Sequence, residues 1–389
     1  MTGVLTFTDL RVVARQIGAE IAAPHADEVD RNSRFPVEAI NALKDAGAMS
    51  AFVPVALGGM GCSMRDLAAM CEVLGEHCSA TGMVFAMHQI QVGSIVRHCG
   101  DSAYFRAYLR DLVEHQNLIA SVTSEVGVGG DMRSSVCAIE RDGDVFTLMK
   151  DATTISYGGY ADDLLITTRR DAGAPASDQV LVLARKADLV LEQTSTWDTL
   201  GMRGTCSNGF KLRVTGSVSQ ILDVEFATIA SHTMVPFSHI LWAGLWLGIA
   251  SGAISRARVF VRAEARKKPG TLPPTAIRLA EAMNALQTMR ASVYEVARDC
   301  EERMREGVDT LSTVTFALKM NNLKISASQQ VFAIVYQAMQ ICGISSYKNN
   351  TPFSLGRPLR DSLSAALMVG NDRIYATNAQ LALILKENT

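Results

Sequence analysis

The feature that most constrains the fold is the helical periodicity of the chain after Glu225. Apolar residues recur there at helical spacing, and the pattern predicts four long helices over residues 238–267, 276–305, 313–342 and 362–386. Long helices that each carry an apolar stripe bury those stripes by packing side by side. The sequence therefore predicts a C-terminal four-helix bundle over residues 226–389.

The rest of the chain divides into two further regions. Residues 1–117 read as helical, with Ser63 expected to cap a helix over 64–78. Between 118 and 225, β-branched and alternating runs separated by turn residues predict strands near 136–139, 145–148, 164–168, 180–184 and 210–214. The predicted fold class is α+β: an N-terminal all-helical domain (1–117), a middle β-barrel-like domain (118–225) and the four-helix bundle.

Composition excludes several classes of function. Among 389 residues the net charge is −2, so nothing points to nucleic acid or an anionic membrane surface. The longest apolar run, 240–254, is too short for a bilayer and predicts a buried helix. The eight cysteines include no Cys-x-x-Cys pair, which predicts free thiols and no metal site. Met1–Asp9 lacks a secretory pattern, so we expect a cytoplasmic protein.

Four short motifs occur in order along the chain: Pro54-Val-Ala-Leu-Gly58-Gly59-Met-Gly61, Ser124-Glu125-Val-Gly127-Val-Gly129-Gly130-Asp131, Leu200-Gly201-Met-Arg203-Gly204-Thr205-Cys-Ser207, and Gln340-Ile-Cys-Gly343 followed by Arg360-Asp361 and Gly370. Their sequences and spacing resemble those of the acyl-CoA dehydrogenases, a family of flavoproteins. The resemblance covers residues 9–385. It implies the helical, β, helical order of domains, a flavin cofactor and a homo-oligomer, either a tetramer or a dimer.

The resemblance places one edge of the flavin ring against the β-domain. Ser124 stands where the family contacts the pyrimidine edge of the ring, and Thr154, Ile155 and Ser156 fall on the segment beside flavin N5. Ser156 keeps a hydroxyl there, whereas Thr154 replaces an aromatic residue that usually covers the ring. The alternative for the glycine-rich stretch after Ser124 is an ordinary β-turn.

The remaining cofactor contacts are expected from the helical bundle. Gln340 and Gly343 match residues that reach the flavin diphosphate from a neighbouring subunit, and Gly370 and Asn371 are placed with the cofactor. Arg266 keeps positive charge where the family receives the adenine, although the Phe-Gly of that motif is missing. FAD is the expected cofactor, and FMN or a diffusible reduced flavin is the alternative.

The chain departs from the family at the catalytic base. The residue before Gly370 is Val369, where the family has the glutamate that removes the substrate α-proton, and valine cannot accept a proton. The remaining candidates for acid–base chemistry are His88, His239 and Asp372. His88 is either a core histidine bonded to a backbone carbonyl or a group on the substrate side. The alternative for Asp372 is an ion pair with a neighbour.

The same departures define the expected substrate site and function. His88, Gly130 and Val369 are the substrate-binding candidates, and Gly130 replaces a serine that touches the acyl-thioester carrier in the family. Relatives without the glutamate include flavin-dependent monooxygenases and oxidases. The leading hypothesis is an oxygen-using enzyme that acts on an acyl thioester or a small specialised metabolite, served by a flavin reductase or an electron-transfer protein. The alternatives are an acyl-CoA or acyl-carrier-protein dehydrogenase with a relocated base, and a non-catalytic homologue.

Overall fold

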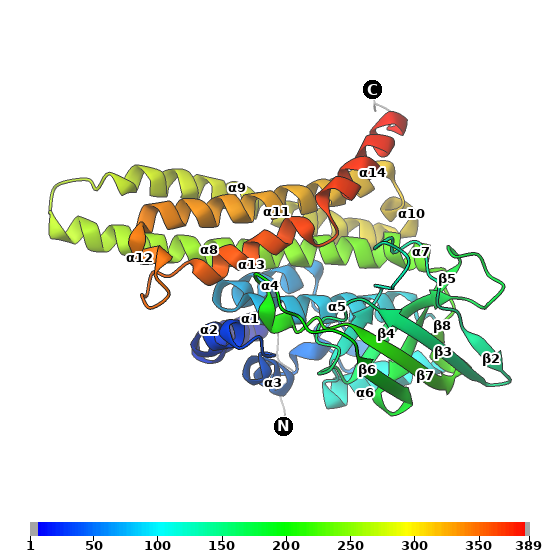
Figure 1. The fold of residues 1–389 in the computed structure, drawn as a ribbon. Helices are drawn as coiled ribbons and strands as arrows, with labels where there is room; N and C mark the ends of the chain where they lie inside the picture. Colours follow the sequence, from blue (N-terminus) through cyan, green and yellow to red (C-terminus); the bar gives the residue numbers. More distant parts are fainter. Residues whose placement is uncertain (1–6, 386–389) are drawn as a thin grey trace.

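The computed structural model describes residues 7–385 (Figure 1). Part of the N-terminal segment that was read for a secretory pattern and Lys386, the predicted end of the last helix, lie outside that range. The described chain runs from a helical N-terminal region through two small β-sheets to a set of long helices. The predicted α+β architecture is therefore confirmed.

The N-terminal region is helical up to His115. Its α-helices are α1 (Phe7–Gln16), α2 (Ala23–Arg31), α3 (Val37–Asp45), α4 (Met64–His77), α5 (Ser79–His98) and α6 (Ala103–His115). A π-helical segment, η1 (Ile17–Ala22), joins α1 to α2, and two short 3-10 turns, η2 (Ala48–Ser50) and η3 (Val55–Leu57), follow α3. Ser63 caps α4 as predicted: Asp66 N donates to Ser63 Oγ at 3.3 Å, and Ser63 N donates to the Asp66 carboxylate at 2.8 Å.

The middle region contains two four-stranded sheets. The first has the order β1-β4-β5-β8, and β1 runs parallel to β4; the second has the order β2-β3-β7-β6 and is antiparallel. The strands are β1 (Ile119–Val122), β2 (Glu140–Asp142), β3 (Val145–Ala152), β4 (Asp163–Arg169), β5 (Gln179–Arg185), β6 (Leu189–Gln193), β7 (Phe210–Ser217) and β8 (Ile221–Leu222).

Two strand predictions need correction. The segment 136–139 is not a strand; Ala138 makes only an isolated bridge to Arg169, and the hairpin strand is β2. The alternation of Val136-Cys-Ala-Ile predicted a strand. The backbone N–H groups of Val136 and Cys137 instead donate hydrogen bonds to the Glu125 carboxylate, so they do not pair with a neighbouring strand. Strand β6 was not predicted: its sequence, Leu189-Val-Leu-Glu-Gln, has three consecutive apolar residues and no clear alternation, and its side chains are half-buried or exposed.

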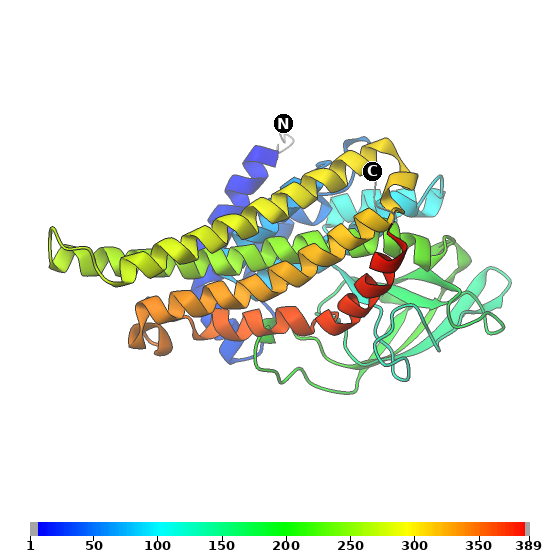
Figure 2. The ribbon, with the colours of Figure 1, turned by 90° about the horizontal axis from the view of Figure 1, so that it is seen from above.

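Three long helices dominate the C-terminal region: α8 (Val235–Lys267), α9 (Thr275–Glu306) and α11 (Val314–Cys342), which lie side by side (Figures 1 and 2). Shorter helices complete it: α7 (Phe226–Ile229), α10 (Val308–Leu311), α12 (Ile344–Tyr347), α13 (Gly356–Leu367) and α14 (Asn371–Ile384). The single helix predicted over 362–386 is wrong. It is broken between α13 and α14, where Val369 has a φ of 48° that a right-handed helix cannot contain.

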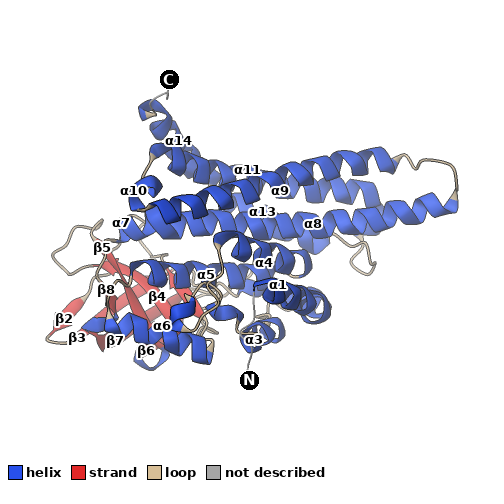
Figure 3. Cartoon of the chain, turned by 180° about the vertical axis from the view of Figure 1, so that it is seen from behind, coloured by secondary structure: helices blue, strands red, loops and turns tan. Residues whose placement is uncertain are grey.

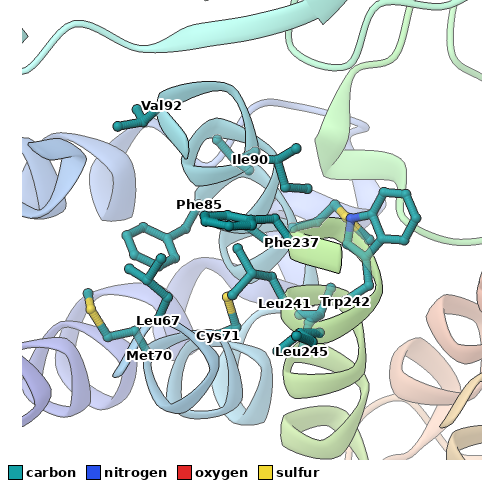
Figure 4. Packing of buried hydrophobic residues seen from close by; sticks show 14 of the residues in the cluster. Leu67, Met70, Cys71, Phe85, Ile90, Val92, Phe237, Leu241, Trp242 and Leu245 are labelled. Carbon is teal, nitrogen blue, oxygen red and sulfur yellow. The ribbon is translucent and has the colours of Figure 1, made fainter. Parts of the chain in front are cut away.

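The core runs through the contact between α4, α5 and α8 (Figure 4). Helices α4 and α8 approach closely because Gly248 leaves no side chain between them; a Cβ there would collide with the Glu72 carbonyl. By length and composition the helical stretch Phe226–Lys267 could cross a membrane, but 89% of its most apolar window is buried inside the fold. The predicted buried helix is thus part of this core.

Candidate functional site

Two of the sequence motifs meet at one rim of the β-domain. Ser124 Oγ donates to the Thr154 carbonyl at 2.6 Å, and Thr154 N donates back to Ser124 Oγ at 3.1 Å. A backbone bond of 2.9 Å from Val126 N to Asp151 O lies beside this pair. Segments 30 residues apart in the sequence are therefore held together, and the rim carries hydroxyl and backbone groups from both.

The Leu200–Ser207 turn supports the second of these segments. Ser156 Oγ and Ser207 Oγ are 2.9 Å apart. Tyr157, which has a φ of 46°, donates its backbone N–H to Thr205 O at 2.7 Å, and its hydroxyl donates to Ile119 O at 3.0 Å. These contacts fix the backbone around Ser156. Ile155 is buried beneath the same segment, so its side chain serves the core of the β-domain.

The Arg360-Asp361 motif joins that turn to the bundle. Met202 N donates to Asp361 Oδ1 at 2.7 Å, and Arg360 donates to Leu200 O at 2.8 Å while pairing with Asp30 on α2. Burial raises the pKa of the Asp361 carboxyl, and the charge of Arg357 opposes that shift. The motif therefore connects three parts of the chain: the N-terminal helices, the β-domain and α13.

The junction between α13 and α14 lies against the Ser124–Asp131 loop. Arg373, in the first turn of α14, donates to the Gly129 carbonyl, and a Cβ at Gly130 would lie 3.3 Å from the Arg373 Nη1 atom. Val369 stands at the junction with its side chain 43% exposed. The structure thus brings Gly130 and the α13–α14 junction to the same part of the molecule.

A lysine that the sequence interpretation missed holds this junction. Lys324 on α11 is fully buried, and its Nζ donates to Val369 O at 2.9 Å and to Asn371 Oδ1 at 2.8 Å. The Asn371 amide also donates to Ser328 Oγ at 3.1 Å, so the side chain of this expected cofactor residue is turned toward α11. Burial lowers the pKa of Lys324 to about 8, and no described carboxylate forms an ion pair with it.

The sequence did carry a signal for this lysine. The buried face of α11 includes Met320, Leu323, Ala327 and Val331, and Lys324 interrupts this otherwise apolar stripe. A lysine at a core position of an amphipathic helix is rare unless it is paired or functional. The interruption would have been visible from the helical periodicity alone.

The two candidate histidines are buried and neutral. Ile119 N donates to His88 Nδ1 at 3.0 Å, and His88 Nε2 lies 2.8 Å from Met49 O, so the proton sits on Nε2. His239 Nδ1 lies 3.1 Å from Met320 O. Burial lowers the pKa of both rings to about 4. Since both nitrogens of His88 are bound to the backbone, the geometry favours the core-histidine alternative over the substrate-side role.

Asp372 is exposed in the first turn of α14. Within residues 7–385 it forms no ion pair, so the neighbour suggested as its alternative partner is not found. A carboxylate in the first turn of a helix interacts favourably with the helix dipole, which gives Asp372 a structural role at this position.

The other expected cofactor residues lie far from this site in the same chain. Arg266 is exposed near the end of α8, Gln340 is exposed in the last turn of α11, and Gly343 follows it with a φ of 55°. The end of the bundle that carries them points away from the β-sheets, as Figures 1 and 3 show. One chain therefore does not gather all the residues assigned to the flavin, and their joint role stays a prediction that needs a second subunit.

No metal centre is apparent in the described part of the chain. Between residues 7 and 385, no group of three or more His, Cys, Asp or Glu side chains is arranged to hold an ion. All eight cysteines are free thiols; seven are buried and Cys99 is partly exposed.

Comparison with known proteins gives the same pattern over nearly the whole chain. Residues 7–116 match the acyl-CoA dehydrogenase N-terminal domain, and residues 230–383 match the acyl-CoA dehydrogenase C-terminal domain. The cyclohex-1-ene-1-carbonyl-CoA dehydrogenase of Syntrophus aciditrophicus is 23% identical over 370 residues, which cover 94% of this chain and 86% of that protein.

Solved structures agree in fold. Butyryl-CoA dehydrogenase from Megasphaera elsdenii superposes with a TM-score of 0.83 at 20% identity, over 98% of this chain and 99% of the other. The dibenzothiophene monooxygenase TdsC from Paenibacillus sp. A11-2, solved with FMN, superposes with a TM-score of 0.83 at 18% identity, over 96% and 97%. Both terminal domains, the middle β-domain between them and the order of all three agree, and the chain belongs to the acyl-CoA dehydrogenase family of flavoproteins.

Proposed function

We propose that this protein is a flavin-dependent monooxygenase or oxidase that acts on a small specialised metabolite or an acyl thioester. The observation that carries the proposal is the residue at the α13–α14 junction, where position 369 holds a valine and not a carboxylic acid. Val369 occupies the family base position, the two candidate histidines are neutral and bound to backbone groups, and Asp372 lies exposed on α14. Abstraction of an α-proton of high pKa needs a positioned base, whereas the reaction of a reduced flavin with dioxygen removes no proton from the substrate.

The rim of the β-domain suits a flavin ring. The ring presents carbonyl oxygens and nitrogens along one edge. Ser124, Thr154 and Ser156 offer hydroxyl and backbone groups from two segments that are hydrogen-bonded to each other. When bound, the flavin supplies the two-electron redox chemistry. We propose FAD, with its diphosphate and adenine reached by Gln340, Gly343 and Arg266 of a second copy; FMN remains the alternative.

A second copy is also suggested by the exposed apolar side chains of the bundle. Phe332 and Tyr336 stack on each other on α11 with ring centroids 6.0 Å apart, and both are partly exposed, as are Tyr347 and Leu367. Exposed aromatic residues on a helix face are typical of subunit interfaces. We propose a cytoplasmic homo-oligomer, and a flavin reductase or an electron-transfer protein as its redox partner.

An acyl-CoA or acyl-carrier-protein dehydrogenase is the second candidate. The curated relatives named above include an acyl-CoA dehydrogenase, which favours this reaction, but a base in a new position would then have to act. A non-catalytic homologue is the third candidate; the Ser124–Thr154 rim and Ser156 speak against it, because they keep hydroxyl groups at the positions where the family contacts the flavin ring.

Reoxidation of the reduced, flavin-loaded protein by dissolved oxygen tests the proposal. Stopped-flow absorbance should show reoxidation well above the rate of free flavin, with a transient species before the oxidised spectrum returns. Slow, single-phase reoxidation would contradict the proposal and favour the dehydrogenase.

Restoring the family carboxylate separates the two enzymes further. Val369→Glu should confer acyl-CoA desaturation if the pocket admits thioesters, and Val369→Gln is the matched control because it adds the same bulk without a base. If wild-type protein already desaturates acyl-CoA and Val369→Glu adds nothing, the dehydrogenase with a relocated base is the better account.

A further inference from the structure

The junction that places residue 369 is strained and is held from one side. Val369 has a φ of 48°, in the left-handed region, where a β-branched residue is an outlier that persists only when its surroundings impose it. The residues on either side, Met368 and Gly370, both have negative φ. The strain is therefore concentrated in one residue, at the position that the proposed function assigns to the reacting side of the flavin.

The contacts that impose this conformation come from one face of α11. Lys324 Nζ donates to the carbonyl of the strained residue at 2.9 Å and to Asn371 Oδ1 at 2.8 Å, and Ser328 accepts from the Asn371 amide at 3.1 Å. Lys324 and Ser328 are four residues apart, so both side chains project from the same side of the helix. Together they hold the backbone on both sides of Gly370.

The charge on this lysine has no described counter-ion. Burying an ammonium group without a carboxylate is unfavourable, so its retention needs a compensating use. The titratable groups on the elements packed against this part of α11 are engaged elsewhere or exposed: His239 is bonded to Met320 O, Asp299 pairs with Lys319 and Arg303, Asp361 accepts from Met202 N, and Asp372 and Arg373 lie exposed on α14. The ammonium group of Lys324 is instead compensated by the hydrogen bonds that it donates to the Val369 carbonyl and the Asn371 side chain.

We propose that Lys324 is the positioning residue of the site: its ammonium group holds residue 369 in the left-handed conformation, so that the side chain at that position faces the flavin. The claim that the side chain of residue 369 faces the flavin rests on the proposed function. The mechanical part, that Lys324 holds the backbone conformation of residue 369, does not. Burial lowers the pKa of Lys324 to about 8, so the charged form carries a free-energy cost in the closed junction that neutralisation relieves.

Hydrogen exchange of the flavin-free protein tests the mechanical part. In Lys324→Met, protection factors of the hydrogen-bonded amides of Met368, Arg373 and Ile374 should fall at least tenfold, while those of α4 and α8 stay unchanged. Ile334→Ala, a buried change ten residues further along α11, is the matched control for general loss of stability. Asn371→Ala serves if Lys324→Met does not fold: it removes the contacts of this side chain with Lys324 and Ser328 but leaves the bond to the Val369 carbonyl, and should lower the same protection factors to a smaller extent.

Two further readouts separate positioning from plain stability. Wild-type protection at the junction should rise between pH 7 and 9.5, because opening the junction returns Lys324 to its ordinary, higher pKa, whereas that of Lys324→Met should stay flat once intrinsic exchange rates are divided out. In a Val369→Gly background, which tolerates the left-handed backbone, the loss caused by Lys324→Met should shrink at least threefold. Unchanged protection at the junction in Lys324→Met, or an equal loss in Ile334→Ala, would overturn the proposal.

The flavin-loaded enzyme links the junction to the reaction. If the junction loosens in Lys324→Met and the oxygen reaction of the mutant slows with little change in KM, both proposals stand. If the junction loosens while wild-type protein shows no fast oxygen reaction, the positioning role stands and the proposed function fails.

Discussion

Two buried lysines in this protein have different partners: one lies beside a carboxylate and the other does not. Lys150 on β3 lies 3.5 Å from the Glu125 carboxylate and donates to Thr167 O at 2.6 Å, inside the β-domain. Lys324 on α11 has no described carboxylate and donates to a backbone carbonyl and an amide oxygen at a helix break. Burial lowers the pKa of both groups, but only for Lys150 does a nearby carboxylate oppose the shift.

The paired lysine belongs to the fold. The Glu125 carboxylate also accepts from Ser135 Oγ at 2.7 Å and from the amides of Val136 and Cys137 at 3.1 and 2.5 Å. This carboxylate thus anchors the loop that follows Ser124 to the sheet. The unpaired lysine lies where the chain must hold an unfavourable backbone conformation, and that location connects it with the site more than with the fold.

The largest expected effect comes from breaking the pair. Glu125→Ala removes the acceptor of three hydrogen-bond donors and leaves the buried Lys150 ammonium without a carboxylate. The free energy of unfolding should fall by about 4 kcal/mol. Urea unfolding measures this, and Glu192→Ala, an exposed position on β6, is the control expected to change little. Adding Lys150→Met to Glu125→Ala should recover part of the loss, and no recovery would mean that the pair is not the reason for it.

The pH dependence of stability sharpens the contrast. The pKa of Lys324 is lowered from 10.5 to about 8 in the folded state, so between these values the unfolded chain binds a proton that the folded chain does not. The free energy of unfolding of wild-type protein should therefore rise with pH across this window relative to Lys324→Met, by about 3 kcal/mol in all. Urea unfolding at pH 7.5, 9 and 10 measures the difference.

The matching experiment uses the paired lysine. The difference in free energy of unfolding between wild-type protein and Lys150→Met should change less with pH over the same range than the difference for Lys324→Met. The reason is that Glu125 opposes the effect of burial on the pKa of Lys150. Parallel curves for wild type and Lys324→Met would show that Lys324 is not buried as a charge, and the contrast between the two lysines would fail.

The smallest effect concerns the backbone that Lys324 holds. Val369→Gly should raise the free energy of unfolding by about 1 kcal/mol, because glycine takes a positive φ without a steric cost. Val369→Ala keeps a Cβ at the same φ and is the control, with a gain well below that of glycine. Equal thermal stability of all three proteins would mean that residue 369 is not strained in solution.

The resemblance to the family was enough to predict which segments form the rim of the β-domain, although their role toward a flavin stays a prediction. The Ser124 and Thr154–Ser156 segments were recognised by their residues and spacing, and the structure places them in contact. The start of α4 followed from the chemistry of Ser63 and Asp66. The role of Asp361 could not be predicted in this way, since its acceptor function depends on a turn 159 residues away in the sequence.

The sequence by itself determined the order of helical, β and helical regions, since periodicity, capping residues and turn residues act over a few positions. The tertiary structure alone decided where the last long helix breaks and what the buried lysine does. Residues 362–386 read as one continuous helix, and the break at Val369 follows from a hydrogen bond donated by Lys324, 45 positions earlier. Local propensity fixes elements, but a strained backbone conformation persists only where distant parts of the chain hold it.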